Sequence, residues 1–464
     1  MNVCFRARAW PVVALALSLQ FIAALAWSQA TAAAGSTTQG SSLVRYLRDT
    51  FSFTGEFRSR WEGGLGTDFA LTPRDSYVLT RMRLGLAFKP TPWLGFFAET
   101  QDARAMFYKV TPGNSVDNPC DWRQGWVEIG RAEGPGMRLR LGRQDMTLGS
   151  GRLVGSGDWT NVTKTFNVAR ATITQNGFKM DIIAGSVVAI DTTRMDRAKP
   201  GEHFYGSYVT LDKILRGATF EPYAFMKTAL KVKSKDGKTG NTDTVYLGGR
   251  LAGKAPDGLD YSVEAVKEAG MYADDVINAF GFVGGGGWMI HSVPWSVRLN
   301  SDYSFATGDS GVTDGHHPSF DYLYGPQNPT ASLTGQFAWK NIKDWRAGVD
   351  FKPFKKLTAK VAFRDYWLAN VKDSLYNSSG VKTVTNAQAT SAHVGEGLDT
   401  QLAYSFNSRT SMGIGVANLA PGSYLTCTCC AVCSKLPRLV GLRVVHKPFR
   451  ILVSRVVNVP GPAV

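Results

Sequence analysis

The chain of 464 residues lacks long apolar runs beyond its N-terminus. No later stretch reaches the roughly 18 apolar residues that a membrane-spanning helix needs, which excludes helical spans. Its six histidines form no H-E-x-x-H pattern, and no G-x-S-x-G segment occurs. The glycine run 284–287 precedes no expected helix, so it does not read as a phosphate loop. We therefore predict no enzymatic activity, no cofactor and no metal site, and interpret His316 and His317 as a solvated loop pair.

The positive charge of the chain is unevenly distributed. Of the formal net charge of +15, two units belong to Arg6 and Arg8, and six belong to the acid-free stretch 425–464. The body between them keeps only +7 and carries no helix-turn-helix, zinc-finger or RNA-binding pattern. A nucleic-acid partner is therefore not expected.

The N-terminus has the features of a secretory signal. Arg6 and Arg8 precede an apolar core at 11–27, and small residues follow at the spacing that a signal peptidase needs. We predict a signal peptide over residues 1–30, cleaved within 28–34, and a flexible lead-in over 31–50 that is rich in Gly, Ser, Thr and Gln.

The body of the chain alternates between apolar and charged residues. In FSFTGEFRSRWE (51–62), aromatic residues share one parity and charged residues the other, and YVLTRMRLGLAF (77–88) repeats the pattern. Period two is typical of β-strands. Runs of ten or more residues with one apolar and one charged face indicate a transmembrane β-barrel with lipid outside and water inside.

Seventeen segments follow this pattern, and the connections between them alternate in length. Odd-numbered connections such as 147–164 and 307–339 are mostly long, and even-numbered ones such as 89–92 and 353–356 are mostly tight. This sorting is typical of an up-and-down antiparallel barrel with long outer loops and short periplasmic turns. The expected strands are 51–62, 77–88, 93–104, 121–131, 137–146, 165–173, 177–188, 203–210, 218–228, 243–251, 258–268, 276–287, 295–306, 340–352, 357–367, 396–406 and 409–418.

The predicted barrel spans residues 51–425 and needs one more strand. Single-chain bacterial barrels have even strand counts, so about 18 are expected, and we interpret the last as lost or replaced. The stretch 426–464 is instead basic and rich in cysteine. Three explanations stay open for it. They are a metal site of Cys427, Cys429, Cys430 and Cys433, a barrel-closing strand within 438–457, and out-of-frame translation near codon 425, which we favour.

Arginine dominates the face that we expect to line the lumen. An arginine excess along a narrow passage favours anions, and guanidinium groups match carboxylate geometry. The inward register predicts the pore-lining residues Arg58, Arg60, Arg81, Arg83, Arg138, Arg140, Arg170, Arg298, Arg346 and Arg364, joined by Arg250, Lys179 and Lys360. Inward acids are fewer and include Glu56, Glu99 and Asp181.

Three stretches resemble the alginate-export family of outer-membrane barrels. They are LRLGRQDMTLGSGRLVGSGDWTNVTKTFN (139–167), NIKDWRAGVDFKPFKKLTAKVAFRDYWLAN (341–370) and FAETQDAR (97–104). The resemblance runs from about residue 46 to 425. It implies an eighteen-stranded barrel that exports a polyuronate through an arginine-rich constriction with acidic residues nearby.

The resemblance also implies specific substrate positions. By motif they are Arg140, Arg143, Arg152, Asp158 and Arg170, together with Glu99, Asp102 and Arg104 from the preceding hairpin. The chain departs from the family at its end, because family members finish in a strand with a terminal aromatic residue and this sequence ends PGPAV.

The sequence thus predicts an outer-membrane channel with an arginine-rich lumen for an anionic, alginate-like polysaccharide. The alternatives are a general anion porin for small carboxylates or phosphate, and a loop-plugged barrel that binds glycans through 307–339 and 368–395. A barrel enzyme would need a Ser/His/carboxylate set at one rim, which the sequence does not reveal. Expected partners are outer-membrane lipid, the barrel-assembly machinery and the transported anion, with a monomer implied by the family.

Overall fold

The computed structural model describes residues 46–47, 49–64, 75–109, 113, 115–131, 134–215, 217–311, 314–325, 332–333, 335–386, 388–426, 439–445 and 449–453. The chain divides into two units, Met1–Phe51 and Ser52–Val464. The predicted signal peptide lies outside the described residues, as does most of the lead-in. No helix in the described part of the chain is long and apolar enough to cross a membrane.

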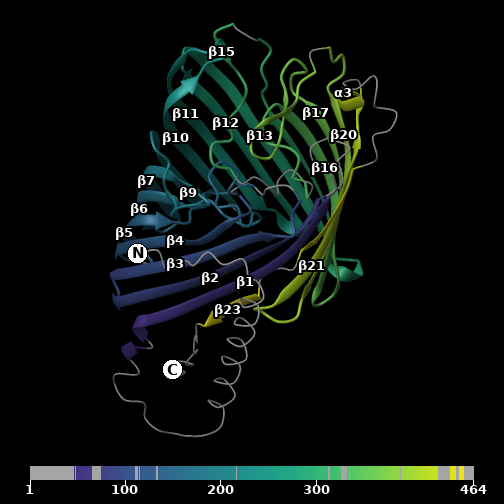
Figure 1. Ribbon diagram of the computed structural model, residues 1–464. Helices are drawn as coiled ribbons and strands as arrows, with labels where there is room; N and C mark the ends of the chain where they lie inside the picture. Colours follow the sequence, from purple (N-terminus) through teal and green to yellow (C-terminus); the bar gives the residue numbers. More distant parts are fainter. Residues whose placement is uncertain are drawn as a thin grey trace. The chain divides into compact units, whose positions relative to one another are not determined.

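The second unit is built on one large antiparallel sheet (Figure 1). Within the described ranges, all seventeen expected strands are confirmed, with ends that shift by a few residues. They are β1 (Phe51–Gly64), β2 (Asp75–Thr91), β3 (Leu94–Met106), β4 (Asn118–Gly130), β5 (Gly136–Gln144), β6 (Phe166–Gln175), β7 (Phe178–Ala189), β9 (Glu202–Leu215), β10 (Ala218–Lys233), β11 (Thr239–Lys254), β12 (Leu259–Tyr272), β13 (Asp275–Ile290), β14 (Val297–Ala306), β16 (Ile342–Phe354), β17 (Leu357–Leu368), β20 (His393–Ser405) and β21 (Ser411–Pro421).

Short elements occupy the connections. They are β8 (Arg197–Ala198), η1 (Pro256–Gly258), η2 (Pro294–Ser296), β15 (His316–His317), β18 (Leu375–Tyr376), β19 (Lys382–Val384) and α3 (Ser423–Thr426). Each long strand pairs with the next long strand along the chain, which is the predicted up-and-down order.

Two segments of the tail close the sheet into a barrel. β22 (Leu439–Val445) pairs antiparallel with β21 on one side and with the Arg60–Gly64 end of β1 on the other. β23 (Phe449–Val453) continues along β1, where it pairs with Phe53–Phe57. Together they occupy the eighteenth strand position. This pairing supports the barrel-closing explanation of 438–457, whereas the reading frame of the tail stays a prediction.

The predicted alternation sets the two faces of the sheet. In β2, Met82, Leu84 and Leu86 are exposed on the outward face, whereas Arg81 and Arg83 are buried on the inward face. The apolar outward band suits lipid, and the charged inward face suits a wet lumen.

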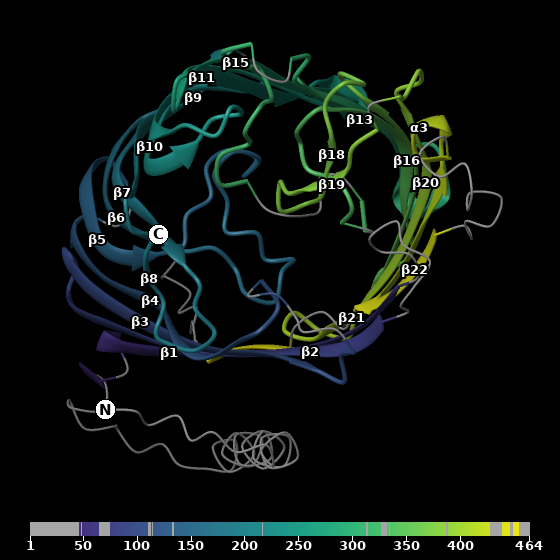
Figure 2. The same cartoon turned by 45° about the horizontal axis from the view of Figure 1, so that its top comes forward.

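Three long connections have described parts that fold into the lumen, and we call these parts the inner loops: the described residues within 145–165, 307–341 and 369–392. In Figure 2, β18 and β19 of the third inner loop lie inside the ring of strands. Tyr324 N donates to the Leu153 carbonyl over 2.8 Å, which joins the first loop to the second. Tyr322 Oη donates to the Ser378 carbonyl over 2.9 Å, which joins the second to the third.

An apolar core holds the inner loops against the wall. Phe320, Trp339 and Tyr376 from the loops are buried with Phe204 and Tyr366 from the strands. Burial of a large aromatic side chain stabilises the folded state by about 1.5–3 kcal/mol. These loops are therefore packed against the wall and are not extended into solvent. They fill part of the space inside the ring of strands (Figure 2).

We expect a chain truncated after Thr426 to fail to form a barrel. Loss of β22 and β23 leaves β1 and β21 with unpaired edges, and unsatisfied backbone groups in lipid cost several kcal/mol each. The heat-modifiable mobility shift of the refolded protein on SDS gels measures this, with the full chain as the control. A truncated chain that still shows the shift would rule out the closing role of the tail.

Candidate functional site

Five arginines on the first strands converge on one segment of the first inner loop. Arg58 and Arg60 come from β1, Arg81 and Arg83 from β2, and Arg123 from β4. All are buried, and each is hydrogen-bonded or ion-paired within this cluster. We call this arrangement the loop anchor, because the segment 158–163 of the inner loop supplies several of its acceptors.

Two carboxylates lie at the centre of the loop anchor. Arg81 is fully buried and pairs with Glu56 of β1. Its Nη2 also donates to Asp158 Oδ1 over 2.9 Å. Arg83 reaches the same Asp158 oxygen at 3.3 Å and Thr163 Oγ1 at 2.9 Å. Asp158 therefore ties the loop to the wall through two guanidinium groups.

Arg58 and Arg60 bind the backbone of the same loop. Arg58 donates to the carbonyls of Asp158 and Thr160 over 2.6 and 2.7 Å. Arg60 donates to the Trp159 carbonyl over 2.6 Å, and its guanidinium lies 4.7 Å from the Trp159 ring centre. These arginines were predicted as pore-lining residues. In the structure they lie on the inward face, but their N–H groups donate hydrogen bonds to the loop.

Arg123 belongs to the loop anchor and was missed by the sequence analysis. Its partners are Glu99, Asp145 and Thr163 Oγ1, the last at 3.0 Å. The register of β3 against β4 runs from Glu99↔Gln124 directly to Thr100↔Trp122, so Arg123 is the extra residue of a β-bulge. A bulge breaks the period-two pattern, which is why parity alone did not reveal it.

A cavity of about 350 Å³ lies between the wall and the first inner loop. Arg83 and Arg123 line it together with Glu56, Asp145 and Asp158. The side chain of Asp158 is 65% exposed, while Arg83 is 8% exposed. Three carboxylates and two guanidinium groups line it, so the cavity is a polar crevice rather than an electropositive one.

Electrostatics keep Asp158 ionised. Burial raises the pKa of this carboxyl, but the charges of Arg81, Arg83 and Arg58 outweigh burial and hold the pKa below its usual range. The anchor therefore keeps its charge pairs at neutral pH.

A second group of inward cations is far more accessible, and we call it the basic wall: Arg138, Arg140, Arg170 and Lys179 on β5, β6 and β7. The exposed fractions are 24% for Arg138 and Arg140, 14% for Arg170 and 43% for Lys179. Their carboxylate partners lie beneath them, with Glu128 9% and Asp181 3% exposed.

Charge on the basic wall does not cancel. Arg140 Nε donates to Glu128 over 2.8 Å, and Arg138 lies 3.7 Å from the same carboxylate. Arg170 forms a two-bond fork with Asp181 at 2.9 Å, and Lys179 lies 3.5 Å from that carboxylate. Each acid thus serves two cations, and the cations face the water.

Register places the basic wall near the short-turn end of the barrel. Arg138 follows the start of β5 closely, and Arg140 lies directly opposite Arg170 on β6. The Arg140 guanidinium also stacks 3.9 Å from the centre of the Trp126 ring, which fixes its orientation. A rigid, oriented guanidinium is pre-organised to receive a carboxylate.

The arginines on the opposite strands are balanced by acids. Arg298 forms two bonds with Asp260 at 2.6 and 2.8 Å, Arg346 lies 3.1 Å from Asp302, and Arg364 lies 2.6 Å from Asp344. Arg250 pairs with Glu221. The predicted inward orientation of this group is reproduced, but as neutral ladders.

Arg152 lies in the first inner loop. Its guanidinium is 5.2 Å from the Trp339 ring centre, so it joins two inner loops. Burial lowers the pKa of Arg152, opposed by the carboxylates of Glu264, Asp302 and Asp344.

Three predicted site residues are corrected by the structure. Asp102 and Arg104 lie opposite Met82 and Thr80 on the outward parity of β3, where they pair with each other at 3.0 Å. Arg143 shares the parity of exposed Leu141 and donates to the carbonyls of Trp122 and Asp196 over 2.7 Å each. Glu99 faces inward, and residues at an even spacing along a strand share one face. Asp102 lies at an odd spacing from Glu99 and therefore faces outward.

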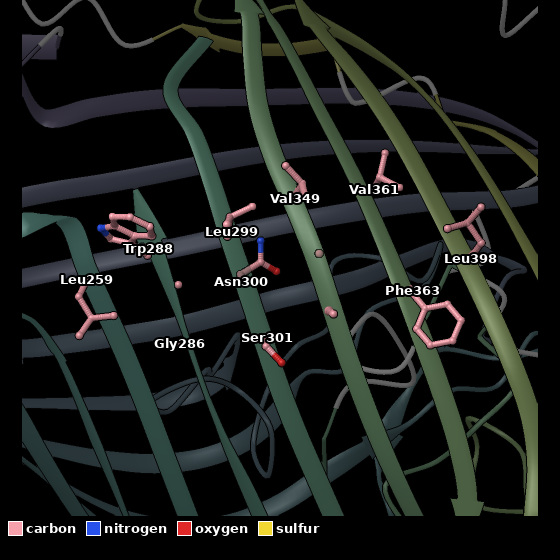
Figure 3. Close-up of a pocket in the computed structure, with 13 residues that line it drawn as sticks. Leu259, Gly286, Trp288, Leu299, Asn300, Ser301, Val349, Val361, Phe363 and Leu398 are labelled. Carbon is pink, nitrogen blue, oxygen red and sulfur yellow. The ribbon is translucent and has the colours of Figure 1, made fainter. Parts of the chain in front are cut away.

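A larger cavity, of about 620 Å³, lies on the outside of the barrel (Figure 3). Trp288, Leu299, Phe363 and Leu398 line it, and all are exposed on the outward parity. Its lining is apolar and faces the lipid band, so it is no part of the passage.

We expect Glu56→Gln to lower the free energy of unfolding by about 3 kcal/mol, because it leaves fully buried Arg81 without its wall carboxylate. Denaturant unfolding in detergent measures the change. Asp102→Asn is the matched control, since it breaks an exposed outward pair and should cost under about 1 kcal/mol. Equal losses in the two variants would show that the loop anchor is not a stabilising centre.

The loop anchor should also respond to acid. Because the folded pKa of Asp158 is depressed, its stabilisation is present above the ordinary value of 3.8 and is lost as pH falls through the folded pKa. Wild type should therefore be more stable than Asp158→Asn at neutral pH, and the two should converge below 3.8. Thermal unfolding across pH measures this, and a gap that persists in acid would contradict the assignment.

Comparison with known proteins agrees with this architecture. Pseudomonas aeruginosa OpdO is 10% identical with a TM-score of 0.58, covering 88% of this chain and 99% of that chain. OpdQ from the same organism is 13% identical with a TM-score of 0.55, covering 86% and 98%. OpdK, solved with vanillate, is 10% identical with a TM-score of 0.53, covering 87% and 99%. At this identity the likeness shows the fold. A search of curated proteins finds no match.

The family comparison reaches further than the fold. A family model described as alginate export matches residues 49–429, most of the chain, and confirms the resemblance seen in the sequence. The family and the porin-like fold indicate a transport channel in the bacterial outer membrane. The chain belongs to the alginate export family.

Proposed function

We propose that the chain is a passive channel for anionic solutes and that an alginate-like polyuronate is its cargo. The observation that carries the proposal is the basic wall. Four accessible cations on β5–β7 share two shielded carboxylates, so a solute that passes along this wall meets net positive charge.

The chemistry of the basic wall suits repeated carboxylates. A guanidinium offers parallel N–H donors to a carboxylate, and Arg138, Arg140 and Arg170 stand on adjacent strands in register. The partly competing acids Glu128 and Asp181 weaken the grip on any single carboxylate. Conduction needs this balance, because a solute must be able to leave each site.

The loop anchor has a different role in this proposal. Its arginines are buried and already hold the first inner loop, so they shape the passage without contacting the solute. This divides the predicted arginine lumen into a structural part and a solute-facing part.

The alternative functions differ in what the inner loops allow. A general porin for small carboxylates or phosphate would use the same basic wall. A plugged barrel that binds glycans is favoured by one observation, the apolar packing of the inner loops against the wall. Conductance in planar bilayers separates the plugged barrel from the two channels.

We expect the triple variant Arg138→Gln, Arg140→Gln and Arg170→Gln to lose anion preference, because Lys179 would then be the one cation of the basic wall left against Glu128 and Asp181. The zero-current potential across a salt gradient measures the preference. Arg104→Gln is the control, since Arg104 is exposed on the outward face. An unchanged potential in the triple variant would exclude the basic wall as the selective element.

Block by oligouronates distinguishes the two channel functions. If the cargo is a polyuronate, block should strengthen with oligomer length, because successive carboxylates engage successive arginines of the basic wall. Block that is independent of length would favour small anions, and neutral oligosaccharides of matched length are the control.

A further inference from the structure

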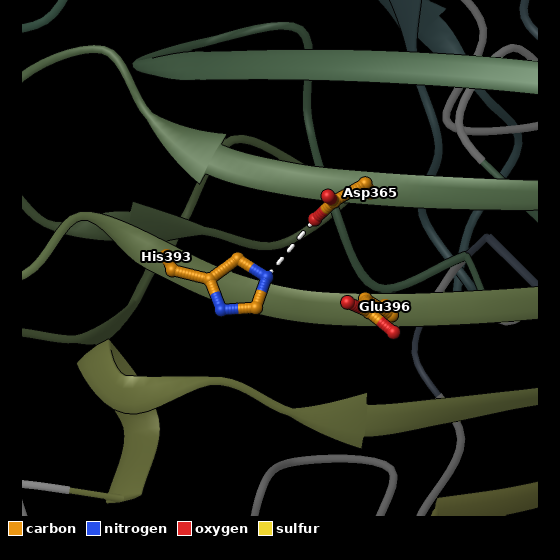
Figure 4. Close-up of side chains that lie close together, drawn as sticks. All are labelled: Asp365, His393 and Glu396. Atoms are coloured by element: carbon orange, nitrogen blue, oxygen red, sulfur yellow. Dashed lines mark hydrogen bonds and ion pairs between the residues drawn. The ribbon is translucent and has the colours of Figure 1, made fainter.

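The outward rim of the barrel carries a cluster that transport does not use. Among the described residues, Asp365, His393 and Glu396 are the group that could hold a metal ion, with one ligand atom from each lying within 4.8 Å of the others (Figure 4). His393 Nε2 lies 2.9 Å from Asp365 Oδ1. Asp365 precedes the end of β17 at Leu368, and His393 begins β20, so the cluster lies at the long-loop end.

A β-bulge brings the three side chains to one face. His393 and Glu396 are three residues apart and would face opposite sides of a regular strand. The register passes from Tyr366↔Gly395 to Trp367↔His393, so Val394 is an extra residue. Gly395 has a φ of +147°, and a Cβ there would overlap the Ala420 carbonyl oxygen. Glycine therefore permits the bulge that assembles the cluster.

The cluster faces outward and has an excess of negative charge. Asp365 shares its parity with exposed Phe363, and Glu396 shares its parity with exposed Leu398. Asp365 and Glu396 are direct cross-strand neighbours, an arrangement that is unfavourable for like charges. Lys343 faces the same side opposite Trp367, yet it forms no ion pair within the described part of the chain.

We propose that Asp365, His393 and Glu396 form a site for a divalent metal ion of the zinc class. One imidazole nitrogen and two carboxylate oxygens are ligands that such ions accept, and three protein ligands leave a further position open to water. The metal would replace the proton between His393 and Asp365 and would neutralise the facing carboxylates. The site is independent of the proposed transport function.

A nucleophilic site is the competing chemistry for a His–Asp pair at a rim. Ser391 lies two residues before His393 in the chain, but its hydroxyl and that of Ser423 bond to each other over 2.6 Å. Among the described residues, neither hydroxyl bonds to the His393 ring; Ser391 Oγ accepts the His393 backbone N–H over 3.3 Å. The arrangement that activates a serine is therefore not formed.

The position of the site predicts a structural role for the metal. β17 and β20 are the two strands from which the third inner loop, 369–392, enters the lumen. A metal bound by Asp365 on β17 and by His393 and Glu396 on β20 joins the two stems of this loop. We expect metal to raise the thermal stability of the barrel, because it binds only the folded arrangement.

Titration calorimetry with Zn²⁺ tests the site on the full chain, refolded in detergent, washed with EDTA and purified with a tag that lacks histidine. Wild type should bind one Zn²⁺ and unfold at a higher temperature with it. His393→Asn and Glu396→Gln should each weaken binding by about tenfold or more and lose the thermal shift. Both positions are solvent-accessible, so both variants should fold.

The matched control is the double variant His316→Asn and His317→Asn. It removes the two consecutive histidines of β15, which are not among the proposed ligands, and should leave binding unchanged. Absence of saturable Zn²⁺ binding by wild type would overturn the proposal. Binding that survives His393→Asn, or that disappears in the double variant, would overturn it as well.

Discussion

Backbone hydrogen bonding in lipid is the constraint on which the whole structure depends. No water is present in the membrane core to satisfy N–H and C=O groups, so a spanning sheet must close on itself. Closure by β22 and β23 between β21 and β1 meets that requirement. Closure in turn fixes a face for every residue, because alternation along each strand sends one side chain to lipid and the next to the lumen.

The inward face that results carries two groups of arginines that differ in burial, and we propose transport for the accessible group. The loop anchor uses buried arginines of β1, β2 and β4 to hold the first inner loop, and its five positive charges are matched by Glu56, Glu62, Asp158, Glu99 and Asp145. The basic wall leaves its cations in water above buried acids. We therefore propose that buried arginines hold the inner loop and that accessible arginines contact the solute.

The sequence predicted the strands well, because they follow from period-two alternation over long runs, and the same alternation assigns a face to each arginine. Arg81 and Arg83 beside exposed Met82 and Leu84 illustrate this. Alternation does not predict the face of a residue at a β-bulge, where one strand has an extra residue. Arg123 is such an extra residue and faces inward, and the extra residue Val394 lets His393 and Glu396 share a face. The family resemblance predicts Asp102, Arg104 and Arg143 as site residues, but alternation assigns them to the outward face, where the structure places them.

Burial and pairing could not be predicted from the sequence at all. They depend on where the inner loops fold, and loops of this length carry no periodic signal. The hydrogen bond from Arg81 to Asp158 Oδ1, for example, forms only because segments distant in the chain meet.

The location of a bound anion tests the central claim most directly. Crystals of the refolded barrel soaked in bromide, measured for anomalous scattering, would show where anions collect in the lumen. We expect bromide beside Arg138, Arg140 and Arg170 and none beside the buried arginines of the loop anchor. Bromide that avoids the basic wall, or that gathers instead beside Arg298 and Arg346, would contradict it.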